Sequence, residues 1–188
     1  QTGHVVISFV RHRPSFCRHN KYRIFFRFDM ILSPLISVII PVWNVSRYVE
    51  RSFRSLLDQT YGNIEYIIVD DASPDNSMGI ISSLLESYPC KKVKIIAHQK
   101  NRGLAAARAT GLSHASGEYI LQLDSDDCFE KDYVESMASA ACETQSDIVI
   151  CDYQAVYPHG ERYFSQEFRG DGKQLCESIL VGKTQGFV

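Results

Sequence analysis

Three carboxylates follow directly on an apolar run in the segment LQLDSDDCFE, residues 121–130. They belong to Asp124, Asp126 and Asp127, and like charges this close repel one another and resist burial unless a cation offsets them. Carboxylates in an Asp-x-Asp arrangement are the hard oxygen ligands that Mg²⁺ or Mn²⁺ prefers. Two such ligands leave coordination positions for water and for a diphosphate, so the segment predicts a metal-assisted phosphate site.

Other polar and aromatic side chains follow the remaining predicted strands. Trp43 comes after the first strand, Asp70 and Asp71 end the second, and Asn101 and Arg102 follow the third. Ligands of parallel sheets bind outside the carboxyl ends of the strands, where these residues should meet. Trp43 is suited to stacking on a base, and Asp70 or Asp71 could accept a hydrogen bond from a base N–H. Arg102 could place positive charge near phosphate.

Each of these residues alone has a structural explanation, since an Asp at a strand end often caps the following helix. The whole set on one edge is different, because so many like charges in one cleft require a cation or a cationic ligand.

An alternation of strand and helix patterns positions these residues. Apolar, β-branched runs predict strands at 35–41, 64–70, 93–98, 118–124 and 147–153. Amphipathic spacing predicts helices at 46–59, 76–88, 103–115 and 130–143, the first with Ser46 as its N-cap. The fold class is therefore α/β, with a mainly parallel sheet and helices on both faces. Residues 154–173 are polar and are expected to be irregular.

Charge is distributed unevenly along the chain. The whole sequence carries a net charge of −2, whereas residues 1–29 hold Arg and Lys with a single acid, Asp29. The rest of the chain is therefore acidic, and we expect no nucleic-acid partner. We divide the chain into a basic N-terminal extension at 1–33, expected to be disordered or non-native, and a domain at 34–188. The extension is also aromatic, so peripheral contact with an anionic membrane is compatible with it.

Several other classes of protein are disfavoured. The six cysteines contain no CxxC pair and favour reduced thiols, and no apolar stretch reaches the roughly 20 residues that span a bilayer. We therefore expect a cytoplasmic protein, with the inner face of the membrane as its contact if the extension binds there. No G-x-G-x-x-G follows a strand, and Gly182-Lys183-Thr184 lacks the strand and the glycine of a phosphate loop.

Five segments carry a family resemblance by their order and spacing: PLISVIIPVWN, LLDQTY, IEYIIVDDASPDNS, NRGLAAARATGL and SGEYILQLDSDD. Together they closely resemble the family 2 glycosyltransferases over residues 33–153. The resemblance implies the GT-A (Rossmann-like) fold. It further implies transfer of a sugar, with inversion, from a nucleotide-sugar donor, often a UDP-sugar, to a glycan or lipid-linked acceptor, with Mg²⁺ or Mn²⁺ as cofactor.

The resemblance also implies which residues bind the donor. The residues that match donor-binding positions of the family are Pro41, Trp43, Glu50, Asp70, Asp71, Asn101, Arg102, Arg108, Asp124, Ser125 and Asp126. Trp43 matches the residue that stacks on the base. Asp126, the last residue of the DxD motif, matches the most direct metal ligand, and Asp124 supports it.

The general base of the family has no match in this sequence. It lies further beyond the DxD motif than the chain extends, and Glu161, Glu167 and Asp171 come too early for it. We therefore expect a GT-A domain truncated at its C-terminus, with the base beyond Val188. The alternative function is a non-catalytic fragment that binds nucleotide-sugars.

A phosphatase-type or receiver-like site is a third interpretation, with an Asp of the DSD motif or of the Asp70-Asp71 pair accepting a phosphoryl group. It is disfavoured because the DSD motif follows the fourth strand rather than the first. Cys128 also stands where such hydrolases have Thr or Val.

Overall fold

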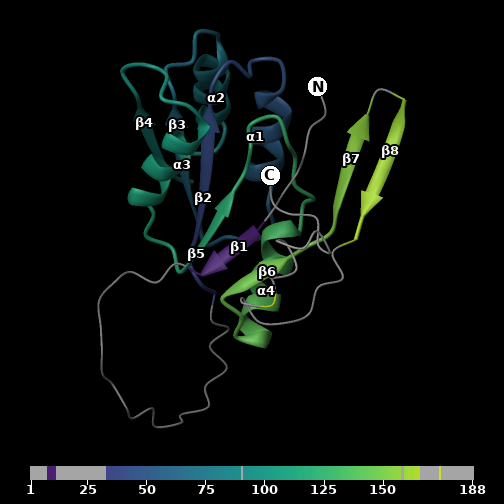
Figure 1. Ribbon diagram of the computed structural model, residues 1–188. Helices are drawn as coiled ribbons and strands as arrows, with labels where there is room; N and C mark the ends of the chain where they lie inside the picture. Colours follow the sequence, from purple (N-terminus) through teal and green to yellow (C-terminus); the bar gives the residue numbers. More distant parts are fainter. Residues whose placement is uncertain (1–7, 12–32, 90, 158, 166–173, 175–188) are drawn as a thin grey trace.

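The computed structural model describes residues 8–11, 33–89, 91–157, 159–165 and 174, and these form a six-stranded sheet with helices and a separate hairpin (Figure 1). The sheet has the order β4-β3-β2-β5-β1-β6. Its strands are β1 (Ser8–Arg11), β2 (Ile36–Val42), β3 (Ile64–Asp70), β4 (Lys92–Ala97), β5 (Tyr119–Gln122) and β6 (Ile148–Ile150). The helices are α1 (Val49–Leu57), α2 (Ser77–Glu86), α3 (Leu104–Ser113) and α4 (Tyr133–Thr144), and the hairpin is β7 (Tyr153–Tyr157) and β8 (Gly160–Phe164).

The centre of the sheet is parallel, as predicted. β2 pairs in parallel with both β3 and β5, and β3 pairs in parallel with β4. All seven residues of β2 are buried, as are the first six of β3. A parallel strand covered on both faces must be apolar along its whole length, which explains the continuous Val and Ile runs in the sequence.

Helices cover both faces of the sheet, which confirms the predicted layering. On one face, α1, α2 and α4 contribute to a core with alternate residues of β2, among them Val38 and Ile40. On the other face, Ala107 of α3 packs against Ile67 and Val69. The small residues of α3 let it lie close to the sheet, since a Cβ at Gly111 would be 2.3 Å from Ile39 Cγ2.

The expected last strand at 147–153 is wrong in its extent. β6 is limited to Ile148–Ile150, and Tyr153 already belongs to the hairpin. β1 lies between β5 and β6 and is antiparallel to both. Residues 8–11 come from the stretch that we assigned to the N-terminal extension, and the rest of that stretch up to residue 32 lies outside the described residues.

The irregular structure expected from residue 154 onward is also wrong where the chain is described. β7 and β8 pair antiparallel from Tyr153 with Phe164 to Tyr157 with Gly160, and the hairpin projects away from the large sheet (Figure 1). The rings of Tyr153 and Phe164 stack with centroids 4.7 Å apart, and the Arg162 guanidinium lies 4.7 Å from the centre of the Phe164 ring. Two of these side chains, Arg162 and Phe164, belong to the stretch that we expected to be irregular.

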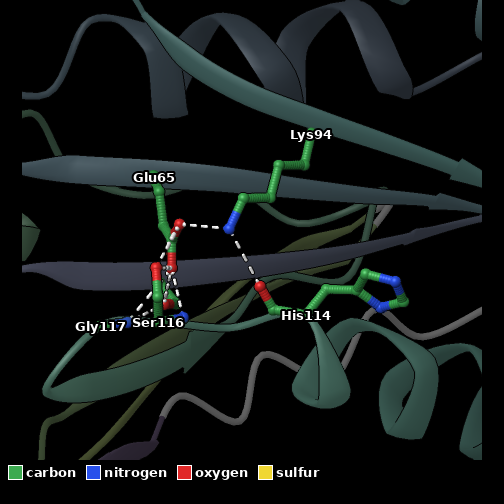
Figure 2. Close-up of polar contacts among 6 residues, drawn as sticks. Glu65, Lys94, His114, Ser116 and Gly117 are labelled. Atoms are coloured by element: carbon green, nitrogen blue, oxygen red, sulfur yellow. Dashed lines mark hydrogen bonds and ion pairs between the residues drawn. The ribbon is translucent and has the colours of Figure 1, made fainter.

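A buried carboxylate ties the sheet together at the amino ends of its strands (Figure 2). Glu65 of β3 is 4% exposed, and its Oε1 accepts from the Ser37 hydroxyl at 2.5 Å and from the Ser116 N–H at 2.6 Å. The Lys94 ammonium of β4 donates to Oε2 at 2.9 Å and to the His114 carbonyl at 3.1 Å. The cluster therefore joins β2, β3, β4 and the loop before β5.

Hydrogen bonds decide the charge state of Glu65. Burial alone would raise the pKa of this carboxyl, but the donors from Ser37, Ser116 and Lys94 outweigh it and lower the pKa to about 2. Gly117 completes the cluster, because its N–H donates to Ser37 Oγ at 2.7 Å and a Cβ there would be 2.6 Å from the Ser37 nitrogen.

No described helix has the length and apolar character needed to cross a membrane.

Candidate functional site

A cavity of about 500 Å³ lies at the carboxyl ends of β2, β3 and β5. Seven of the predicted donor-binding residues line it: Pro41, Trp43, Asp71, Asn101, Asp124, Ser125 and Asp126. Segments separated by more than 80 residues thus meet at the edge where ligands of parallel sheets bind. Trp43 is 49% exposed, so its side chain is accessible to a ligand.

Four predicted residues do not line the cavity. Asp70 Oδ1 accepts from the Ser73 N–H at 2.8 Å, and Glu50 pairs with Arg54 one turn along α1 at 2.9 Å. The Arg102 N–H donates to Asp71 and the Arg108 guanidinium to Asp124, so both arginines are held next to residues that line the cavity. For these four residues, direct contact with a ligand stays a prediction.

The two carboxylates of the DSD motif lie in different environments. Both Asp124 oxygens accept from the Arg108 guanidinium, at 2.7 and 2.9 Å, so a cation of the chain already offsets this charge. Asp126 is exposed and, within the described part of the chain, has no hydrogen bond or ion pair. Ser125 between them is buried and donates to the Pro41 carbonyl, which anchors the motif to the end of β2.

This arrangement fits a cation that takes only a small share of its ligands from the protein. No group of three or more His, Cys, Asp or Glu side chains is placed to hold a metal among the residues that the structure describes. Mg²⁺ and Mn²⁺ commonly bind through one or two carboxylates, with water and phosphate oxygens completing the shell. Asp126 has a carboxylate that is open to such an ion, and Asp124 lies two residues before it.

Asp71 is buried at the wall of the cavity, and its side chain is almost fully hydrogen-bonded. Oδ1 accepts from the Arg102 N–H at 2.8 Å and contacts His98 Nδ1 at 2.6 Å, while Oδ2 accepts from the Gly103 N–H at 2.8 Å. Burial opposes ionisation, but these donors outweigh it and lower the pKa of Asp71. Gly103 has a φ of 84°, a conformation in which a side chain is strained, so the loop turns here into α3.

The loop that presents Trp43 is held by the loop after β3. Its backbone N–H groups at 44, 45 and 46 donate to Ser73 Oγ at 2.9 Å, Ser77 Oγ at 3.1 Å and Asp75 Oδ2 at 2.7 Å. Asp75 also accepts from the Ser77 hydroxyl and N–H and from the Ser73 hydroxyl. Together with the Ser46 N–H, these donors outweigh the effect of burial and lower the pKa of Asp75. Ser46 is therefore not the helix cap that we predicted: α1 begins at Val49 after Tyr48, and no side chain caps it.

Replacement of Asp75 by Ala is expected to loosen the Trp43 loop. The substitution removes the acceptor for the Ser46 N–H, and we expect it to lower the free energy of unfolding by about 1–3 kcal/mol. Trp43 is the single tryptophan of the chain, so steady-state fluorescence anisotropy reports its mobility directly. The anisotropy should fall in Asp75→Ala and stay unchanged in Asp132→Ala, an exposed Asp that does not line the cavity. Equal anisotropy in the two variants would contradict this role of Asp75.

A second cavity of about 1030 Å³ adjoins the first and shares Trp43, Val45 and Asp126 with it. α1, the segment after the DSD motif and the β7–β8 hairpin form its walls. Its lining is rich in aromatic and acidic side chains, among them Tyr48, Asp127, Phe129, Tyr133, Asp152, Tyr153 and Tyr163. Asp127 is 8% exposed, and burial together with the charges of Asp126 and Asp124 raises its pKa to about 7.

Sequence reading missed several apolar residues of the first cavity: Val42, Val45, Gly103, Leu104 and Ala107. Val42 and Val45 flank Trp43, and the other three lie at the start of α3. Leu104 is 51% exposed although it is a large apolar side chain at the mouth of a cavity.

Comparison with known proteins identifies the family. The profile of glycosyl transferase family 2 matches residues 37–185. Glycosyltransferase GlyA of Streptococcus pneumoniae is 38% identical over 148 residues, which are 76% of this chain and 20% of that protein. Glycosyltransferase GlyG of the same organism is 37% identical over 151 residues, 80% of this chain and 48% of that protein. The chain thus spans less than half the length of these relatives.

Solved structures agree with the fold. A complex of Staphylococcus aureus TarS 1–349 with UDP superposes with a TM-score of 0.56 at 29% identity, covering 60% of this chain and 33% of that one. The complex of the same protein with UDP-GlcNAc gives a TM-score of 0.55 at 30% identity, covering 60% and 32%. The predicted GT-A fold class is confirmed, and the chain belongs to glycosyl transferase family 2.

Proposed function

We propose that this chain binds a UDP-sugar in the first cavity and serves an inverting, metal-assisted transfer of the sugar to a glycan or lipid-linked acceptor. The observation that carries the proposal is the meeting of Trp43, Asp71 and the open carboxylate of Asp126 in one cavity of about 500 Å³. Each matches one part of a nucleoside diphosphate. The complexes of TarS with UDP and UDP-GlcNAc support the choice of uridine.

The roles follow from the base to the phosphates. Trp43 stacks on the base, and Asp71 accepts a hydrogen bond from a base N–H. Asp126, with Asp124 in support, would hold Mg²⁺ or Mn²⁺, which when bound neutralises the diphosphate and stabilises its departure. Arg108 keeps Asp124 oriented and offsets its charge, so that the two carboxylates do not repel each other at full strength.

The second cavity is the place that we assign to the acceptor. It shares Trp43 and Asp126 with the donor cavity, so a molecule bound there lies next to the sugar. Tyrosine rings offer flat apolar faces together with a polar hydroxyl, a combination suited to sugar rings. The residue that deprotonates the acceptor hydroxyl is not assigned.

The test is a titration of the chain with UDP, with and without Mn²⁺, followed through the fluorescence of Trp43. Stacking of the base on the sole tryptophan should change its emission saturably. Metal and nucleotide should strengthen each other's binding by about 5- to 150-fold, the usual range of coupling between neighbouring sites. Absence of UDP binding, or binding indifferent to Mn²⁺, would count against the proposal.

A second measurement separates the enzyme from the alternative of a non-catalytic fragment. Release of UDP from a UDP-sugar, by transfer or by hydrolysis, shows that the chain is catalytically active. Saturable binding with no release above the uncatalysed rate supports the binding fragment instead.

A further inference from the structure

His98 follows β4 and does not itself line the cavity. Its side chain is 5% exposed and contacts Asp71, which does line it. Nδ1 is 2.6 Å from Asp71 Oδ1, and Nε2 is 2.9 Å from the Thr110 hydroxyl of α3. The imidazole therefore bridges the end of β3 and the helix that covers this face of the sheet.

The direction of the hydrogen bonds follows from chemistry. An ionised carboxylate only accepts, so Nδ1 carries the proton and donates to Asp71. The Thr110 hydroxyl can donate to a neutral Nε2 or accept from a protonated one, so the contact with Asp71 persists in either charge state of the ring. The lowered pKa of Asp71 agrees with an ionised partner.

Counting acceptor positions shows what remains for a ligand. A carboxylate has about four lone-pair positions, two on each oxygen. On Oδ1, the His98 N–H and the Arg102 N–H occupy both; on Oδ2, the Gly103 N–H occupies one. One position on Oδ2 is left, on a carboxylate that lines the cavity.

We propose that His98 is a positioning residue for base recognition: it holds the Asp71 carboxylate so that one acceptor position faces the donor cavity, which suits a base with a single N–H on its pairing edge. This inference rests on the proposed function. Uracil has one such N–H, at N3, whereas guanine presents two adjacent N–H donors that require both oxygens of a carboxylate. The geometry therefore selects uridine nucleotides over guanosine nucleotides.

The test compares two variants of equal shape, His98→Asn and His98→Leu. Asn and Leu have nearly the same size, and both lose the contact with Thr110, but Asn can still donate to Asp71 Oδ1. Each variant is titrated in Mn²⁺ with UDP and with 3-methyluridine 5′-diphosphate, in which a methyl group replaces the N3 hydrogen. Thermal unfolding is followed in parallel, and Thr110→Val and His114→Leu, an exposed histidine, serve as controls.

We expect the wild type to bind UDP about tenfold more tightly than the methylated nucleotide, the effect of one charge-assisted hydrogen bond. This preference should persist in His98→Asn and in both controls, and fall to about threefold or less in His98→Leu. If His98 had only a structural role, its replacement would weaken the binding of both nucleotides equally. His98→Asn and His98→Leu would then have the same effect. The wild type should also bind UDP more tightly than GDP.

The outcomes separate this inference from the proposed function. Binding of UDP by the wild type, with the same preference in His98→Leu, would overturn the role of His98 and leave the proposed function intact. Equal affinity of the wild type for UDP and GDP would also overturn it. Failure of the wild type to bind any nucleotide would overturn both. If His98→Leu does not fold, His98→Ala, which also lacks a donor to Asp71, takes its place: loss of the preference in His98→Ala supports the inference, and retention overturns it.

Discussion

Replacement of Asp126 by Asn should abolish the dependence of UDP binding on Mn²⁺. In the wild type, this carboxylate is exposed and free of hydrogen bonds and ion pairs within the described part of the chain. A neutral amide of the same shape is a much weaker ligand for a hard cation. We therefore expect the 5- to 150-fold gain in UDP affinity with Mn²⁺ to fall to nearly one, whereas affinity without metal changes little.

Asp132→Asn is the matched control for Asp126→Asn. Asp132 carries the same charge, is exposed and precedes α4 outside both cavities, so its substitution should leave the Mn²⁺ effect unchanged. Isothermal titration calorimetry, with UDP titrated into metal-free and Mn²⁺-loaded protein, measures the Mn²⁺ effect for each variant. Retention of the full Mn²⁺ effect in Asp126→Asn would remove Asp126 as the ligand and direct attention to Asp124.

Replacement of Glu65 by Ala should produce the largest loss of stability. The buried carboxylate accepts from Ser37, from the loop before β5 and from Lys94, and its removal leaves these donors without an acceptor. Loss of one member of a buried charged cluster typically costs about 3 kcal/mol or more. Glu65→Gln keeps an acceptor but sets its amide N–H₂ against the Lys94 ammonium, so we expect a smaller loss of about 1–2 kcal/mol.

The dependence on pH distinguishes the charge of Glu65 from its packing. Its pKa is lowered to about 2 in the folded state, against 4.5 as the ordinary value, so the unfolded chain takes up this proton first as the pH falls. The stabilisation is complete above pH 4.5 and is lost between there and about pH 2. The difference between the wild type and Glu65→Gln should therefore be smaller at pH 3 than at pH 7.

Urea unfolding at the two pH values measures this difference. Glu86→Gln, an exposed substitution at the end of α2, should change the free energy of unfolding by less than about 0.5 kcal/mol at either pH. A Glu65→Gln difference that is the same at pH 3 and pH 7 would show that the charge of Glu65 contributes nothing.

The central strands could be predicted well from sequence, and the reason is local. β2 and β3 are covered on both faces, so nearly every position must be apolar and the run is visible without knowledge of its neighbours. The start of α1 could not be predicted in the same way. The N–H groups that precede it are bound by Ser73, Asp75 and Ser77, which lie about 30 residues further along the chain.

The pairing of β1 was beyond sequence reading for a similar reason. Its backbone bonds to β5 and β6, strands more than 100 residues away, and a four-residue strand has no distinctive pattern of its own. The β7–β8 hairpin has no regular alternation of apolar and polar residues, and its mixed polar and aromatic residues resembled a loop.

The kinds of residue at the site and the strand ends that carry them follow from the chain order alone. Parallel strands bring their carboxyl ends to one edge, so the aspartates after β3 and β5 had to lie near Trp43. These aspartates are chemically alike, however, and in sequence only the family resemblance of the DxD motif distinguishes Asp126 from the others.

Folding gives these aspartates different tasks by giving them different partners. Arg108 binds Asp124, His98 and two loop amides bind Asp71, and Asp127 is buried with a raised pKa. Asp126 keeps an open carboxylate. Hydrogen-bond partners and burial come from segments distant in sequence, and they decide charge state and availability. The tertiary contacts therefore determine which carboxylate is open to a cation.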